Sequence, residues 1–423
     1  MNRLQQLRAH LKLIRQDPDL LNPLRYLGPG LLVAVGFIDP GNWASNVAAG
    51  AGFGYRLLWM VTLSTVMLIF LQHNAAHLGI VTGDCLAEAA TRHLPAWQAR
   101  PALGSAVLAT VATAFAEILG GAIGLGMLFH LPLKLGACLT AGVAIWLVLK
   151  NTYPAIEKII VGFVAMIGLG FLFELALVRL HWGQAAAGWV KPAFPAGSMT
   201  VIMSVLGAVV MPHNLFLHSE FIQSRQLHRQ GPEAIQAHLR FEFVDTLLSM
   251  GVGWAINSAM ILLAAATFYQ RHLAVDSLEQ AEAMLRPILG PVAGVVFAVA
   301  LLASGLASTV TAGMAGGSIF TGALGRSYSI RETGSRAGVL LSLLPALLAV
   351  FFVRDTFQAL ILSQVLLSIQ LPVTIVLQIH LTSSRKVMGD YANRALGKTM
   401  LWAVAAAVIV LNLMLLWSIL QGG

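Results

Sequence analysis

Charged residues are scarce in this chain, and their scarcity decides its structural class. Of 423 residues only 10% are Asp, Glu, Lys or Arg, against about 25% in an ordinary soluble domain. Hydrophobic residues make up 57% of the chain, and they gather in runs of the length that crosses a lipid bilayer as a helix. We therefore predict an all-α integral membrane protein with no soluble domain.

Cysteine is also scarce, and the motifs of enzymatic chemistry are missing. The two cysteines, Cys85 and Cys138, cannot build a disulfide framework, and no Cys/His cluster stands beside them to bind zinc. No phosphate-binding loop and no nucleophile–base pair is present, so we expect neither an enzyme nor a bound cofactor. The net charge of +8 would suggest nucleic acid in a soluble protein. In a membrane protein it is explained by cytoplasmic loops that face anionic lipid, so no nucleic-acid partner is expected.

The apolar runs predict eleven transmembrane helices. Most of the 26 lysines and arginines fall in segments on one side, which predicts a cytoplasmic N-terminus and an extracytoplasmic C-terminus in the cell inner membrane. The polar and basic residues 1–27 are expected to form a cytoplasmic leader. The predicted spans are 29–53, 57–82, 102–128, 131–150, 155–178, 199–218, 243–269, 289–322, 337–354, 357–382 and 399–420.

Two interruptions of the apolar runs point to the function. Asp39-Pro40-Gly41-Asn42 lies in the first span and Met211-Pro212-His213-Asn214 in the sixth. Ionisable and polar groups are costly at that depth and mark a functional site. Spans one to five and six to ten have opposite orientations, and each set opens on such a break. This layout predicts two inverted repeats, at about 28–178 and 199–382, with a loop and an extra helix in 383–423. It is typical of a transporter core.

The chemistry of the first break favours a cation. Asp39 is the only acid in the span, Pro40 and Gly41 interrupt the helix, and Asn42 follows three residues after the acid. A carboxylate, an amide oxygen and freed backbone carbonyls together are cation ligands.

The second break adds a sulfur atom. Pro212 cannot donate a hydrogen bond and displaces the carbonyl one turn back, that of Ala208, so this carbonyl and the Met211 thioether are expected to point the same way. Because sulfur suits transition metals better than Ca²⁺ or Mg²⁺, the set predicts a divalent ion such as Mn²⁺ or Fe²⁺ as the substrate.

Four further sites have two interpretations each. His213 either relays a proton beside the ion or braces the broken helix by hydrogen bonding. Glu117, a lone acid within the third span, either carries a proton or makes a structural hydrogen bond. Gln364 either turns its amide oxygen to the ion or binds a neighbouring helix. The pair His73 and His77, one helical turn apart, has metal-binding spacing but no third ligand, which favours an interfacial or gate-lining place.

The sequence resembles the natural resistance-associated macrophage protein (Nramp) family of proton-coupled divalent-metal transporters, in its bacterial manganese-transporter branch. The two breaks carry the resemblance, and it extends over nearly the whole chain. The matching segments are 36–42, 79–83, 211–219, 302–305, 363–368 and 381–390.

This resemblance implies a LeuT-type fold, a 5+5 inverted repeat with one extra helix. It implies import of Mn²⁺, and also of Fe²⁺, Cd²⁺ and Co²⁺, by a monomer that uses alternating access and H⁺ co-transport. The implied metal ligands are the Asp39 carboxylate, Asn42, the Ala208 carbonyl and Met211, joined in some conformations by Gln364 or the Gly36 carbonyl. The residues that match positions tied to proton movement are His213 and Glu117, with Asp39 as a third proton-transfer group.

Two positions depart from the family pattern. An acid usual one turn before Glu117 is replaced by Ala114, and an arginine pair usual in the ninth span is replaced by Gly338 and Val339. Loss of both charges together avoids an unpaired buried charge, so we expect an altered proton route.

Three other functions are open on sequence grounds. A Mg²⁺ carrier on the same scaffold is disfavoured because Mg²⁺ gains nothing from the Met211 sulfur. An organic-solute symporter of LeuT-type fold is disfavoured because Asp39 would repel a substrate carboxylate. The third alternative function is that of a non-transporting sensor or a channel.

Overall fold

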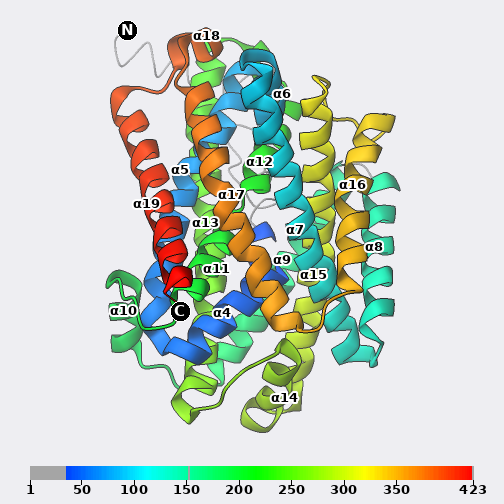
Figure 1. Ribbon diagram of the computed structural model, residues 1–423, viewed down its shortest axis with the longest axis vertical. Coiled ribbons are helices and arrows are strands. Elements are labelled where there is room, and N and C mark those ends of the chain that lie inside the picture. Colours follow the sequence, from blue (N-terminus) through cyan, green and yellow to red (C-terminus); the bar gives the residue numbers. More distant parts are fainter. Residues whose placement is uncertain (1–34, 151–152, 422–423) are drawn as a thin grey trace, which may run out of the picture.

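The computed structural model describes residues 35–150 and 153–421, and all regular structure in these ranges is helical. Most of the long helices run along the long axis of the molecule (Figure 1). Ten stretches in the described ranges are long and apolar enough to cross a membrane. The all-α membrane fold is confirmed. The leader predicted at 1–27 and the start of the first predicted span lie outside the described residues.

The long helices fall on the predicted spans. Those of the first half are α4 (Pro40–Phe53), α5 (Leu58–Thr82), α7 (Ala96–Phe129), α8 (Leu133–Lys150) and α9 (Tyr153–Ala176). Those of the second half are α11 (Met199–Val209), α12 (Pro212–Ser224), α13 (Pro232–Thr267), α15 (Pro291–Ala323), α16 (Thr333–Val350), α17 (Thr356–Thr382) and α19 (Ala395–Leu420). Shorter helices connect them: η2 (Val35–Ile38), η3 (Gly54–Leu57), α6 (Leu86–His93), α10 (Trp182–Val190), η4 (Leu227–Gln230), η5 (Tyr269–Arg271), α14 (Leu278–Leu289), α18 (Arg385–Met388) and η6 (Gly389–Tyr391).

The predicted boundaries are wrong where a helix continues beyond its apolar part. The seventh predicted span starts at residue 243, but α13 begins at Pro232, where proline is accepted because the first helical N–H has no partner. The third is predicted from residue 102, but α7 begins at Ala96. Hydropathy detects the part of a helix that meets lipid, whereas hydrogen bonding sets its full length.

Both predicted breaks are present in the backbone. Asp39 caps α4 with an extended backbone, and Pro40 takes the first helical position. Between α11 and α12 the chain leaves the helix at Val210 and Met211, and Pro212 starts the new helix. Each proline stands where its missing N–H costs no helical hydrogen bond.

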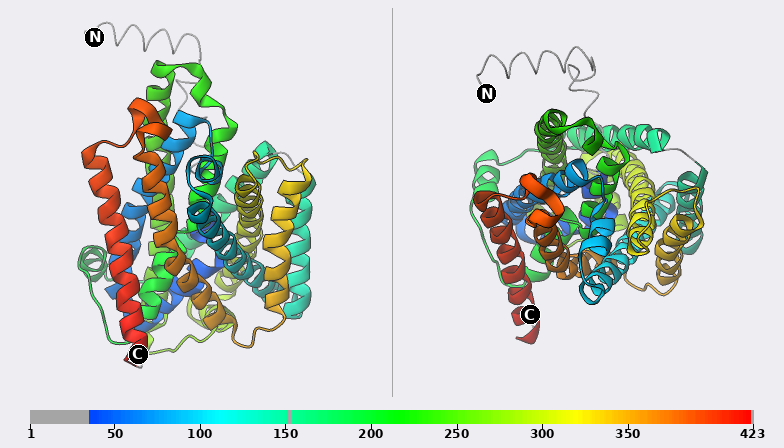
Figure 2. Two further views of the ribbon diagram at one scale, coloured as in Figure 1. Left: turned by 45° about the horizontal axis from the view of Figure 1, so that its top comes forward. Right: turned by 90° about the horizontal axis from the view of Figure 1, so that it is seen from above.

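The packing of the helices matches an inverted repeat. Helices at corresponding places in the two halves lie against each other: α5 against α13, α7 against α15, and α8 against α16. In addition, α4, which follows the first break, lies against α11, which precedes the second. The view along the bundle shows α7, α8, α15 and α16 on one side of the molecule and α19 at the opposite edge (Figure 2). The two breaks therefore meet in the interior.

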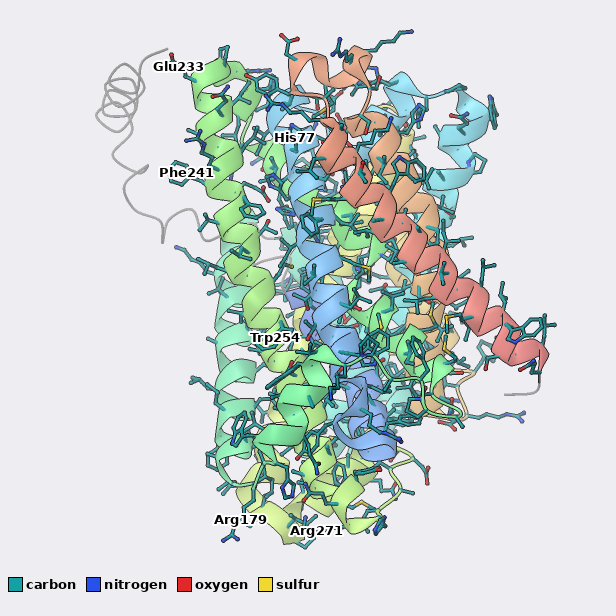
Figure 3. The ribbon with its side chains drawn as sticks, turned by 90° about the vertical axis from the view of Figure 1, so that its left-hand side faces the viewer. His77, Arg179, Glu233, Phe241, Trp254 and Arg271 are labelled. Atoms are coloured by element: carbon teal, nitrogen blue, oxygen red, sulfur yellow. The ribbon has the colours of Figure 1, made fainter. Side chains whose placement is uncertain are left out.

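Apolar side chains cover the outer surface of the bundle, as a lipid environment requires. Exposed examples on α9, α17 and α19 are Leu169, Leu172, Leu362, Leu366, Leu413, Leu416 and Trp417. Charged residues gather at the two ends. Glu233, in a loop predicted to be cytoplasmic, lies at one end, and Arg179 and Arg271, predicted to be extracytoplasmic, lie at the other (Figure 3).

Candidate functional site

The two helix breaks face each other across the middle of the bundle. The Asn42 side chain, in the first turn of α4, donates from Nδ2 to the backbone oxygen of Ala208 at 3.0 Å, near the end of α11. Ala208 is one turn before Pro212, so the proline has freed this carbonyl as the sequence predicts. A residue pair 166 positions apart thus joins the two halves of the chain.

Three oxygens converge on the Asn42 amide nitrogen. Asp39 Oδ1 accepts from Nδ2 at 2.6 Å, the Ala208 oxygen at 3.0 Å and the Gly36 oxygen at 3.5 Å. Asp39 Oδ1 also accepts from the Asn42 backbone N–H at 2.8 Å, which caps α4. Asp39, Asn42 and Ala208 are each 0% exposed. The predicted carboxylate and carbonyl ligands therefore surround one buried point.

This arrangement suits a cation in place of the amide nitrogen. A buried carboxylate requires a compensating charge or several donors, and here the amide N–H groups supply the donors. Asn42 Oδ1 has no hydrogen-bond partner. If the amide turned about its last bond, Oδ1 would join the other three oxygens around a central ion. Four oxygen ligands of this kind match the preference of divalent cations.

Met211 stands beside this oxygen set at the start of α12. It is 0% exposed, and its sulfur accepts from Asn214 Nδ2 at 3.5 Å. The rest of the side chain packs with Ala109 and Leu367. Asn214 also lies against Gly36, where a Cβ would run into the amide of Asn214. Asn214 was not among the predicted ligands, although it belongs to the second break and links the sulfur to the Gly36 segment.

Gln364 reaches the site from α17. It lies two turns into α17, and its Nε2 donates to Asp39 Oδ2 at 3.5 Å and to Ser363 Oγ at 3.3 Å. Gln364 Oε1 is buried without a hydrogen-bond partner. Because any Cβ at Gly41 would occupy the place of this amide, the glycine of the first break allows Gln364 to reach the acid. Gln364 therefore lies at the site with its amide nitrogen toward Asp39, and which of its two interpretations holds stays a prediction.

The two predicted proton groups, Glu117 and His213, are connected through α7. The carboxyl groups of Glu117 and Asp39 lie within hydrogen-bonding reach of each other, and Ser308 of α15 donates to Glu117 Oε2. His213 meets α7 through its Nδ1, which lies 3.2 Å from Thr113 Oγ1. Thr113 precedes Glu117 by one turn, so α7 connects the histidine to the acid.

Sequence comparison identifies the family of the chain. The family model Nramp, described as natural resistance-associated macrophage protein-like, matches residues 30–418. The chain is 37% identical over 403 residues to the divalent metal cation transporter MntH of Caldanaerobacter subterraneus subsp. tengcongensis, with 94% of each chain covered. The chain belongs to the Nramp family. It is 38% identical over 411 residues to the MntH of Ralstonia nicotianae, covering 94% of this chain and 92% of the relative.

Solved structures agree with the Nramp assignment. The Eremococcus coleocola manganese transporter superposes with a TM-score of 0.76 at 29% identity, covering 93% of this chain and 86% of that one. Mhp1, a nucleobase-cation-symport-1 family transporter, superposes with a TM-score of 0.63 at 13% identity, which shows a shared fold alone. The predicted LeuT-type architecture and the predicted resemblance are confirmed, and as an Nramp protein the chain is a transporter and not an enzyme.

The two departures from the Nramp pattern lie in tightly packed surroundings. Ala114 and Val339 are both 0% exposed. A Cβ at Gly338 would lie 2.8 Å from the Gly316 oxygen, so α15 and α16 are in backbone contact there. This contact leaves no space for an arginine side chain at position 338 without separating the helices.

The histidines predicted at an interface lie in a polar network away from the central site. His73 Nδ1 pairs with Glu242 Oε2 of α13, and its ring stacks on that of His77 with centroids 6.5 Å apart. His218 Nδ1 lies 2.6 Å from Gln72 Oε1. His218 is fully buried on α12, and its Nε2 lies 3.9 Å from Glu242 Oε1 of α13.

Proposed function

We propose that this Nramp protein imports divalent transition-metal ions, Mn²⁺ together with Fe²⁺, Co²⁺ and Cd²⁺, by alternating access. The observation that supports it is the convergence of the Asp39 carboxylate and the Ala208 and Gly36 carbonyls on the Asn42 amide. The curated relatives carry the name divalent metal cation transporter, and the solved relative is a manganese transporter. We place the protein in the cell inner membrane as a monomer, with a cytoplasmic N-terminus.

The ligand set supports a transition metal over a hard alkaline-earth ion. Oxygen ligands alone bind Mg²⁺ and Ca²⁺ as well as Mn²⁺, so the oxygens provide affinity but do not discriminate among these ions. The buried Met211 sulfur at the second break favours softer ions. We infer that the thioether sets the selectivity.

The complete burial of the site supports alternating access. Asp39, Asn42, Ala208, Met211 and Gln364 are each 0% exposed, so an ion held here is separated from both membrane surfaces. Release then requires helices around the breaks to move. The half-helices α4 and α12 are suited to this because each begins at the site and is hinged there by non-helical backbone.

We propose proton co-transport along a route that begins at the paired carboxyl groups. A hydrogen bond between the Asp39 and Glu117 carboxyl groups requires that one of them holds a proton. An arriving divalent ion attracts the ionised form of Asp39 and displaces that proton. His213 of α12 contacts Thr113, and Thr113 lies one helical turn before Glu117 on α7. With Ala114 and Val339 in place of charges, the onward path must differ from the usual family route.

The test is Mn²⁺ uptake into proteoliposomes that contain the purified full chain. We expect uptake by the native protein and none by Asp39→Ala, because that variant lacks the only charged ligand. Asp276→Ala, which removes an acid from an exposed loop, is the matched control and should transport normally. Cd²⁺ should compete with Mn²⁺ and amino acids should not. Undiminished uptake by Asp39→Ala would refute the proposed function, and competition by amino acids would favour an organic-solute carrier.

A further inference from the structure

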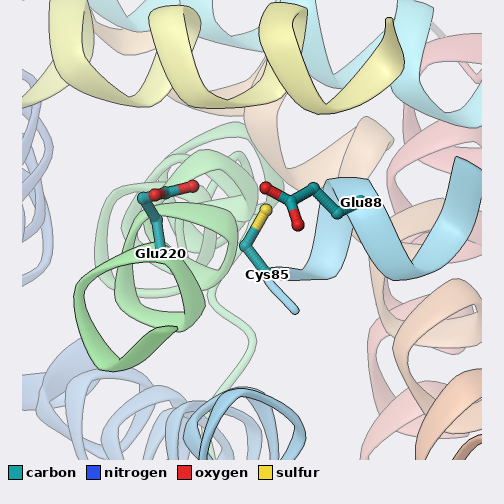
Figure 4. A group of neighbouring side chains, drawn as sticks. All are labelled: Cys85, Glu88 and Glu220. Carbon is teal, nitrogen blue, oxygen red and sulfur yellow. The ribbon is translucent and has the colours of Figure 1, made fainter. Parts of the chain in front are cut away.

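A second group of ligand-type side chains lies away from the broken-helix site. Cys85 immediately precedes α6, Glu88 is in the first turn of α6, and Glu220 lies near the end of α12 (Figure 4). One ligand atom from each of the three residues lies within 4.8 Å of the other two. Their exposures are 1% for Cys85, 0% for Glu88 and 7% for Glu220. The cluster stands at the end of the molecule predicted to be cytoplasmic.

Neighbouring side chains orient both carboxylates of the cluster by hydrogen bonds, and the Cys85 thiol also hydrogen-bonds to the Glu220 carboxyl group. Glu88 Oε2 accepts from Gln223 Nε2 at 2.8 Å and lies 3.4 Å from Arg92 Nη2. Glu220 Oε2 accepts from Ser318 Oγ at 2.7 Å. Outer partners of this kind orient metal-binding carboxylates and fix which oxygen faces the ion.

The second oxygen of Glu88 has no partner. Glu88 Oε1 is buried and accepts no hydrogen bond, although a buried acceptor left unsatisfied is costly. The Glu88 carboxyl group is directed toward the Cys85 sulfur (Figure 4). An unpaired, fully buried carboxylate oxygen beside a thiol is the feature that a cation would satisfy.

Burial favours the protonated, uncharged forms of these side chains when no ion is bound. Burial raises the pKa of the Cys85 thiol, and the nearby acids raise it further. Burial also raises the pKa of Glu88 despite the nearby Arg92. A bound divalent ion stabilises the ionised thiolate and carboxylates and releases their protons, so its affinity rises with pH.

We propose that Cys85, Glu88 and Glu220 form a second divalent-metal site, separate from the transport site, that takes Zn²⁺, Cd²⁺ or Co²⁺. A thiolate and two carboxylates supply three protein ligands, and a water molecule completes a tetrahedron. Thiolate excludes Mg²⁺ and Ca²⁺, which require oxygen ligands. The ion would join the α5–α6 connection to α12, the half-helix that begins at the second break.

A cavity borders one residue of the cluster. It has a volume of about 370 Å³ and is lined by Glu220 together with Lys150, Tyr328 and Arg336. Its walls include the ends of α8 and α12 and the segment between α15 and α16. Glu220 therefore faces a space that is separate from the broken-helix site.

The test is Co²⁺ titration of the purified full chain in the Asp39→Ala background, which removes the charged ligand of the transport site. Co²⁺ bound to a thiolate gives a near-ultraviolet charge-transfer band, which carboxylates and the Met211 thioether do not. We expect this band in the Asp39→Ala protein and in the same protein with Cys138→Ser, the matched removal of the exposed cysteine. Cys85→Ser should abolish it. Glu220→Gln should weaken Co²⁺ binding by roughly tenfold or more.

A second measurement does not depend on the folding of the Cys85 variant. In Cys138→Ser protein the sole thiol is Cys85, and Cd²⁺ should slow its reaction with a maleimide. A charge-transfer band that is absent, or that follows Cys138, would refute the site. Equal maleimide rates with and without Cd²⁺ would also refute it and would leave a protonated, hydrogen-bonded cluster. Because the readouts need no transport, their failure is distinguishable from failure of the proposed function.

Discussion

At the scale of single residues, the site separates affinity from selectivity. Asp39 supplies the charge, and the carbonyls of Ala208 and Gly36 supply further oxygens around the Asn42 amide. Met211 supplies the one soft atom, and its sulfur is already held by Asn214 at 3.5 Å. Substitution of the acid and substitution of the methionine should therefore have different consequences.

Met211→Ala is expected to retain Mn²⁺ transport and to admit Ca²⁺ or Mg²⁺. Loss of the thioether removes the ligand that hard ions cannot use, and discrimination against Ca²⁺ should fall at least about tenfold, or ~1.4 kcal/mol. Uptake of each ion by proteoliposomes measures this ratio. Met203→Ala, which removes another fully buried methionine from α11, should leave it unchanged. A Met211→Ala protein that still excludes both hard ions would show that the sulfur does not set selectivity.

At the scale of elements, close helix contacts position the ligands. A Cβ at Gly207 would overlap the backbone oxygen of Gln364, so α11 and α17 touch where Ala208 and Gln364 reach the site. Gly338 and Gly316 likewise allow the backbones of α16 and α15 to come into contact. Small residues permit such approaches between membrane helices.

Gly207→Ala is expected to destabilise the protein by about 1–3 kcal/mol, because the added methyl group must push α11 from α17. Thermal unfolding in detergent measures the loss. Gly142→Ala in α8 is the matched control, since a Cβ there meets nothing within 4 Å, and it should be neutral or slightly stabilising. Equal melting temperatures for the two variants would contradict the close contact.

The elements also show how far the sequence alone could lead. Continuous apolar runs predict the long helices, and Asp-Pro-Gly and Met-Pro predict the breaks because proline acts locally. The roles of Asn214, Ser304 and Ser308 were not predictable. Ser304 donates to the Ile38 oxygen and Ser308 to Glu117, and these contacts between distant helices leave no periodic or local signal. Likewise, nothing in the sequence brings Cys85 to Glu220, which lie 135 positions apart.

At the scale of the whole molecule, metal binding and proton movement are separable. The proposed metal ligands converge at the helix breaks, whereas the departures that we infer from the resemblance, at Ala114 and Val339, concern only the proton route. Recording Mn²⁺ uptake and internal pH in the same liposomes tests their connection. We expect acidification to accompany uptake and to be lost in Glu117→Gln. Metal entry without acidification would refute proton coupling and leave metal transport intact.

The position of the bound ion tests the proposed transport site most directly. Crystals of the native protein grown with Mn²⁺ and measured at the manganese absorption edge locate the metal directly by its anomalous signal. We predict one strong peak between the two helix breaks, in contact with the Asp39 carboxylate, Asn42, the Ala208 carbonyl and the Met211 sulfur. A strong peak elsewhere with none at the helix breaks would contradict the central claim.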